Sequence, residues 1–138
     1  MRPRFLIDKS ALARMSLEPV RQRIAPIFEA AEAATCAIID LEMLYSARSR
    51  EDYEDIRQRR SLAYHFIPMA ETILQRALTV QAELARIGHH RVAIPDLLIA
   101  ATAESASLIV LHYDRDYDVI ARVTRQPVEW VVARGSVP

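Results

Sequence analysis

Short apolar runs with the composition of β-strands alternate along this chain with longer stretches of helical periodicity. Each run is rich in branched residues and bounded by polar ones, which is typical of a buried strand. The runs cover residues 5–7, 35–39, 65–68, 108–111 and 128–132. Their alternation with helical stretches predicts βαβ units, and therefore an α/β fold with a mostly parallel sheet covered by helices on both faces.

The stretches between the runs carry the spacing and end signals of helices. Ser10 and Asp40 are placed as N-caps, Gly88 as a C-cap residue, and Pro95 at a first helical position. Pro26 lies inside one stretch and predicts a kink or a restart. Helices are thus expected over residues 11–15, 19–34, 41–48, 49–63, 70–87, 95–103 and 117–123.

Composition sets the class of protein and its expected compartment. The chain has 138 residues, of which 51% are hydrophobic and 26% charged, so we expect one globular domain over residues 1–138 with a frayed tail at 133–138. No apolar run has membrane-spanning length and no signal peptide is recognised. Cys36 is the only cysteine, which favours a reducing, cytoplasmic setting.

Charge gives only a weak indication of the partner. The formal net charge is zero, so the overall balance does not indicate a nucleic-acid binder. Lys9 is the only lysine, and the other basic residues are arginines, whose planar fork suits phosphate recognition.

Three carboxylates in five residues, Asp114, Asp116 and Asp118, follow the apolar run at residues 108–111. In open α/β sheets, ligands bind at the carboxyl edge of the strands, which is where this acidic stretch is expected to lie. Like charges repel unless a positive group lies among them, and a divalent cation is a common solution. A solvated turn that caps the next helix explains the segment equally well when it is taken alone.

Three further acids share this predicted location. Asp8 follows the first strand, while Glu42 and Asp96 are expected in the first turns of two helices that begin near the same edge. Convergence of these side chains would create an all-oxygen site without paired Cys or His ligands, which suits Mg²⁺ or Mn²⁺. One or two such ions could bridge a phosphate, generate a hydroxide and stabilise a leaving oxygen, which is the chemistry of phosphodiester hydrolysis.

Other acidic motifs fit less well. The spacing from Asp114 to Asp118 opens like an EF-hand loop, but Val119 and Arg125 stand where that loop needs Gly and Glu. A receiver domain or a haloacid-dehalogenase-like phosphatase would place paired acids after the first strand, where Asp8 is alone.

Four segments in order carry a family resemblance: LIDKSAL at residues 6–12, LEMLYS at 41–46, IPDLLIAA at 94–101 and LHYDRDYD at 111–118. With them the chain resembles the PIN-domain ribonucleases, and among these the VapC toxins of bacterial type II toxin–antitoxin systems. The resemblance extends from the first strand to Trp130. It implies a three-layer α/β/α fold and a Mg²⁺- or Mn²⁺-dependent endoribonuclease.

The resemblance also assigns roles to single residues. Asp8, Glu42, Asp96 and Asp114 match the family's acidic quartet of catalytic metal ligands. Asp116 matches a frequent fifth acid at the metal, Ser10 matches a small hydroxyl residue near the site, and Lys9 stands where many relatives have a smaller residue.

The family further implies partners. These are an RNA substrate, a homodimer and a VapB-type antitoxin whose tail blocks the cleft; contact with DNA would come only through the antitoxin, and no membrane partner is implied. Two alternatives are kept. One is a non-catalytic module whose acidic cleft docks an arginine-bearing partner, and the other is a PIN-type RNA-processing nuclease outside toxin–antitoxin systems.

The remaining polar residues receive structural roles. We expect His112 in a turn, His89 and His90 on a loop surface, Asp118 as a helix cap and Tyr45 in the core. Tyr113 is a candidate for stacking on a base.

Overall fold

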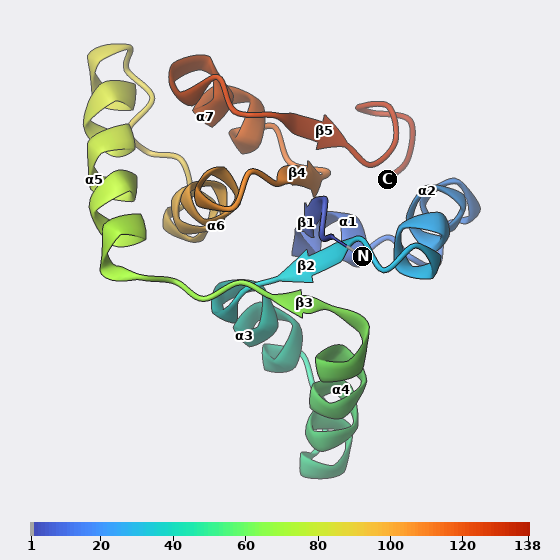
Figure 1. The fold of residues 1–138 in the computed structure, drawn as a ribbon. Coiled ribbons are helices and arrows are strands. Elements are labelled where there is room, and N and C mark those ends of the chain that lie inside the picture. The colour runs from blue at the N-terminus through green and yellow to red at the C-terminus, as the bar shows by residue number, and fades with distance from the viewer. Residues whose placement is uncertain (1) are drawn as a thin grey trace.

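The computed structural model describes residues 2–138, and a five-stranded sheet forms its centre (Figure 1). The strands are β1 (Phe5–Ile7), β2 (Ala33–Thr35), β3 (His65–Phe66), β4 (Ile109–His112) and β5 (Val128–Trp130). They lie in the order β3-β2-β1-β4-β5, and every pairing in this order is parallel. The predicted parallel α/β sheet is therefore confirmed, with β1 at its centre.

Helices cover both faces of this sheet (Figure 1). They are α1 (Lys9–Leu12), α2 (Glu18–Glu29), α3 (Ala37–Tyr45), α4 (Arg50–Ala63), α5 (Glu71–Arg86), α6 (Ile94–Ser105) and α7 (Asp116–Thr124). Alternate residues of β1 face opposite layers, as the pleat of a strand requires. Leu6 packs in a core with α3, α5, α6 and α7, whereas Phe5 and Ile7 pack in a second core with α1 and α2. The three-layer arrangement is therefore confirmed.

The second strand was predicted in the wrong place. Residues 35–39 were expected as a strand, but β2 is Ala33–Thr35 and α3 already begins at Ala37. Cys36 takes the N-cap position assigned to Asp40, and Asp40 lies within the first turn of α3. A short apolar run with branched residues is equally compatible with a strand and with the buried side of a helix. Here Ile39 is a buried residue of α3.

Helix α2 continues through Pro26 without the predicted restart and ends earlier than expected, at Glu29. Ala31 then adopts a left-handed conformation (φ 55°). The backbone N–H of Ala31 bonds the Phe28 carbonyl and that of Glu32 bonds the Ile27 carbonyl, which is the Schellman pattern that glycine usually completes. The chain can therefore turn directly from α2 into β2.

The carboxyl-terminal tail is held against the molecule, although it was expected to be frayed. The Tyr113 hydroxyl donates to the Val137 carbonyl at 2.7 Å, and Arg14 Nε donates to the Pro138 carbonyl at 2.8 Å. Within residues 2–138, no helix combines the length and the apolar character needed to cross a membrane.

Candidate metal and active site

The strand order places the ends of β1 and β4 side by side. From β1 the chain passes to β2 and β3 on one side of the sheet, whereas β4 and β5 pair on the other side of β1. The strand order therefore reverses between β1 and β4. Such a switch point is where open α/β sheets bind ligands. Asp8 follows β1 and Asp114 follows β4, and the backbone N–H of Asp8 bonds the Leu111 carbonyl at 2.9 Å.

Three carboxylates meet at this edge. Asp96 of α6, Asp114 of the loop after β4 and Asp116 of α7 each offer an oxygen, and these oxygens lie within 4.8 Å of one another. Asp114 Oδ1 accepts the backbone N–H of Asp116 at 2.9 Å, and Asp116 Oδ2 accepts the backbone N–H of Ala93 at 3.3 Å. Backbone donors therefore fix two of the three side chains.

Asp96 is the most enclosed member of this triad, with 7% of its surface exposed. Burial, together with the charges of Asp8, Asp114 and Asp116, raises the pKa of the Asp96 carboxyl to about 8. Its Oδ2 is buried and has no hydrogen-bond partner within residues 2–138. A buried carboxylate oxygen without a donor beside two further carboxylates fits a divalent cation bound by oxygen ligands.

Asp8 is connected to the triad through Tyr117. The Tyr117 hydroxyl lies 2.8 Å from Asp8 Oδ1 and 3.3 Å from Asp96 Oδ1, and Tyr117 is fully buried. Burial and the neighbouring charges of Asp8 and Asp96 raise the pKa of the phenol well above its ordinary value. Sequence reasoning missed this residue, although its spacing from Ile120 on the buried side of α7 could have indicated that Tyr117 points inward.

Glu42 lies in the second turn of α3, not in the first turn as predicted, because α3 begins earlier in the sequence. Partial burial and the charge of Asp8 raise the pKa of the Glu42 carboxyl, while the Lys9 ammonium opposes this shift. The Glu42 carboxyl therefore interacts with the charge of Asp8. It is not one of the three acids whose oxygens converge.

Ser10 is not the N-cap that was predicted for the first helix. Asp8, not Ser10, is the N-cap of α1, and Asp8 Oδ2 accepts the backbone N–H of Ser10 at 3.0 Å. The Ser10 hydroxyl accepts the backbone N–H of Tyr113 at 2.8 Å. Ser10 thus links the segments that follow β1 and β4.

His112 was expected in a turn, but it is the last residue of β4 and is fully buried. Its Nδ1 accepts the backbone N–H of Asp114 at 3.1 Å, and burial lowers the pKa of the ring. The ring lies 5.0 Å from those of Tyr117 and Trp130, measured between centroids. His112 therefore stabilises the backbone of the acidic loop through its hydrogen bond to Asp114.

Two other expectations were wrong. Asp118 does not cap α7, because Arg115 holds that position and Asp118 Oδ2 accepts the Trp130 indole N–H at 2.9 Å. Tyr45 is 90% exposed instead of belonging to the core.

Asp40 takes part in a partly buried polar network. Its Oδ1 accepts the Thr35 hydroxyl at 2.8 Å and the Arg60 Nε at 3.0 Å. Arg60 Nη2 also donates to the Thr35 hydroxyl oxygen at 3.0 Å. This network joins β2, α3 and α4, and so fixes the first turn of the helix that carries Glu42.

The comparisons with known proteins agree with this architecture. The PIN domain family model matches residues 5–123. Ribonuclease VapC21 of Mycobacterium tuberculosis is 47% identical over 137 residues and 99% of both chains, and Ribonuclease VapC51 of the same organism is 40% identical over 134 residues and 97% of both chains. The crystal structure of VapBC2 from Rickettsia felis, bound to a promoter DNA fragment, superimposes with a TM-score of 0.74 at 13% identity, covering 94% of this chain and 98% of that one. The chain therefore belongs to the PIN-domain family, within the group of the VapC ribonucleases.

Proposed function

We propose that this protein is a Mg²⁺- or Mn²⁺-dependent endoribonuclease toxin that a VapB-type antitoxin neutralises. The observation that carries the proposal is the buried Oδ2 of Asp96, which has no hydrogen-bond partner among residues 2–138 and lies beside the carboxylates of Asp114 and Asp116 at the switch point of the sheet. Its relatives at 40–47% identity are named ribonucleases, which supports hydrolysis of RNA. Structures of VapBC pairs with the same fold support an antitoxin partner.

In this proposal Asp96, Asp114 and Asp116 hold the cation, and Asp8 and Glu42 complete the acidic set on the β1 side. A bound divalent ion would supply positive charge to the phosphate oxygens and lower the pKa of an attacking water. Tyr117 and Ser10 hold the two oxygens of Asp8 in fixed directions. Glu42 has a raised pKa and is suited to accept the proton of the attacking water.

Two apolar surfaces support the proposed protein partners. Leu74, Leu78 and Ile94 are exposed at 46%, 62% and 66% around a groove of about 270 Å³ between α5 and α6, which is suited to a homodimer contact. A second groove of about 310 Å³, between α2, α3 and α4, has Phe28 and Tyr64 in its lining and is suited to an antitoxin segment.

The experiment compares purified wild type with Asp8→Asn and Asp96→Asn on a mixed RNA substrate, with Mg²⁺, with Mn²⁺ and with EDTA. Asp55→Asn is the matched control, because Asp55 is an exposed acid of α4 that pairs with Arg59 on the same helix. We expect cleavage by wild type and the control with either ion, and none by the two site variants or in EDTA. Circular dichroism checks that all four proteins fold.

Expression in cells tests the toxin assignment. Wild type should arrest growth, and a small protein encoded next to the gene should relieve the arrest when it is expressed together with the toxin. Full cleavage by both site variants, or in EDTA, would contradict the metal-dependent nuclease. Cleavage without growth arrest would favour an RNA-processing enzyme of the cytoplasm, and metal-independent docking of a partner without cleavage would favour a binding module.

A further inference from the structure

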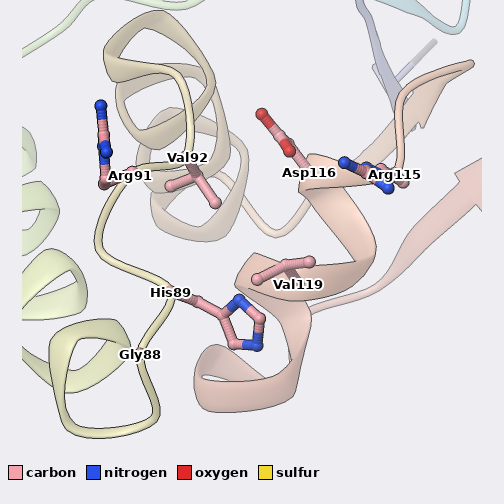
Figure 2. Close-up of a pocket in the computed structure, with 7 residues that line it drawn as sticks. All are labelled: Gly88, His89, Arg91, Val92, Arg115, Asp116 and Val119. Atoms are coloured by element: carbon pink, nitrogen blue, oxygen red, sulfur yellow. The ribbon is translucent and has the colours of Figure 1, made fainter.

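A pocket of about 350 Å³ adjoins the acidic triad and shares Asp116 with it. One wall is the loop between α5 and α6, with His89, Arg91 and Val92, and the other is the start of α7. In Figure 2, Arg91 and Asp116 point to the same side of the pocket. With Arg91 and Arg115 against the single carboxylate of Asp116, the lining of this recess carries a net positive charge on the border of the proposed metal site.

Two arginines of this pocket lack an acidic partner in the described part of the chain. Within residues 2–138, neither Arg91 nor Arg115 forms a salt bridge, although Arg115 lies between Asp114 and Asp116 in the sequence. Both side chains are exposed. Free guanidinium groups are suited to bind phosphate through their paired donors.

The two walls of the pocket are connected to each other. The backbone N–H of Ala93 bonds Asp116 Oδ2 at 3.3 Å, and Arg122 of α7 donates to His89 Nε2 at 3.2 Å. These contacts hold the loop against α7 on both sides of the recess. The backbone segments that carry Arg91 and Arg115 are therefore held against each other, which limits the backbone entropy lost when a ligand binds between them.

The lining also offers contacts for a base. His89 points toward Val119 across the floor of the recess (Figure 2). Bases of single-stranded RNA stack on histidine rings and on guanidinium planes. A pocket of this volume is within the range of small-ligand sites and accommodates one nucleotide.

We propose that this pocket binds the nucleotide next to the cleaved linkage, with its phosphate at Arg91 and Arg115 and its base against His89 and Val119. The inference rests on the proposed ribonuclease function and assigns a substrate-binding role to residues outside the acidic set. RNA is favoured over an acidic peptide because the pocket shares Asp116 with the triad. An RNA strand whose phosphate is bound at the triad can therefore continue directly into the adjoining recess.

The test separates binding of the neighbouring nucleotide from chemistry at the cleaved bond. Arg91→Gln, Arg91→Lys and wild type are assayed on an RNA oligonucleotide and on bis(4-nitrophenyl) phosphate, which carries one phosphodiester and no neighbouring nucleotide. Arg2→Gln is the matched control, because Arg2 is an exposed arginine of a similar pocket at the opposite, amino-terminal edge of β1. Arg91 is preferred to Arg115 because it is distant in sequence from the acidic loop.

We expect Arg91→Gln to raise the KM for RNA about tenfold, the equivalent of about 1.4 kcal/mol, with kcat nearly unchanged. In a plot of the logarithm of RNA affinity against the logarithm of salt concentration, the slope should become shallower by about 0.7, which is the value for one phosphate contact of a single strand. Arg91→Lys should recover part of the loss, and Arg2→Gln and all rates on the small diester should match wild type.

An unchanged KM and salt slope in Arg91→Gln would overturn the inference, as would an equal loss on both substrates. Unchanged RNA kinetics with weaker capture of a partner protein would overturn it in favour of a protein-binding pocket. If wild type cuts neither substrate, the ribonuclease proposal fails. Direct measurement of RNA binding then decides separately whether the pocket is an RNA site. Binding that weakens in Arg91→Gln but not in Arg2→Gln supports an RNA site there, and equal binding by all variants refutes one.

Discussion

The hydroxyl of Tyr117 donates a 2.8 Å hydrogen bond to Oδ1 of Asp8, joining residues that lie 109 positions apart in the sequence. The same hydroxyl oxygen lies 3.3 Å from Asp96 Oδ1. One phenol thus bridges the acid after the central strand and the acid of α6. Asp96 Oδ2 has no such contact within residues 2–138, so it remains available to bind a cation in the proposed site.

Tyr117→Phe should weaken divalent-ion binding about tenfold and reduce RNA cleavage by a similar factor, because loss of a supporting hydrogen bond frees a metal ligand to rotate. Titration calorimetry with Mn²⁺ measures the affinity, and a cleavage assay the rate. Tyr113→Phe is the control, since its hydroxyl bonds the backbone of Val137 in the tail. Equal ion affinity in the two variants would show that the Tyr117 bridge has no positioning role.

The two ends of the acidic stretch should respond differently to the same substitution. Asp114→Asn removes a carboxylate of the triad and should lower divalent-ion affinity at least about tenfold. Asp118→Asn alters an acid that instead accepts the Trp130 indole N–H, and should leave the affinity within about twofold of wild type. Equilibrium binding of Mn²⁺, followed by electron paramagnetic resonance, measures both. A larger loss in Asp118→Asn would refute the assignment of the triad.

Stability without divalent ions should depend on pH through Asp96. Its pKa is raised from an ordinary 3.8 to about 8, so the folded chain binds more protons than the unfolded chain between these values. The contribution of Asp96 is therefore fully present below about pH 4 and is lost as the pH rises toward 8, with a slope on the order of 1 kcal/mol per pH unit at most.

Urea unfolding in EDTA at a series of pH values measures this slope. Asp96→Asn stays neutral throughout and should flatten the curve relative to wild type. Saturating Mn²⁺ should oppose the slope in wild type, because the ion replaces the proton and binds more tightly as the pH rises. Parallel curves for wild type and Asp96→Asn would contradict the raised pKa.

Ala31→Gly should stabilise the fold. Ala31 completes the turn after α2 with φ 55°, a conformation that costs an L-residue about 1 kcal/mol and glycine almost nothing. Part of this gain is offset because glycine makes the unfolded chain more flexible, so we expect a net gain of about 0.5 kcal/mol. Ala30→Gly, one residue earlier at φ −85°, should instead destabilise by a similar amount. Thermal unfolding compares the two, and a loss in both would contradict the argument.

The parallel sheet was predictable because its strands are short apolar runs and its longer helices carry clear periodicity or end signals. The segment around Cys36 shows where this reasoning fails. Its apolar residues pack on the core side of α3. The polar contacts of the first turn of α3 come from Thr35 and from Arg60, a residue of a different helix. A local pattern does not contain a contact made across 20 positions of sequence.

The candidate site divides in the same way. The convergence of Asp96 with Asp114 and Asp116 follows from strand direction and helix starts, which the sequence reveals. The role of Tyr117 does not, because an aromatic residue at a buried helical position is ordinarily core, and its hydroxyl acquires a role only once Asp8 and Asp96 are brought to it. The support that His112 gives to the acidic loop was hidden for the same reason.

The sheet order has a consequence for synthesis of the protein. The central strand β1 is made well before its neighbour β4, which begins only at Ile109. A nascent chain that ends between residues 97 and 108 carries Asp8 and Asp96 but lacks Asp114, Asp116 and the strand that would hold them beside β1. Chains fold progressively as they are made, and this one acquires its full set of acids only once β4 and the start of α7 have been made. We therefore expect a translation product of the proposed nuclease that stops before β4 to cleave no RNA.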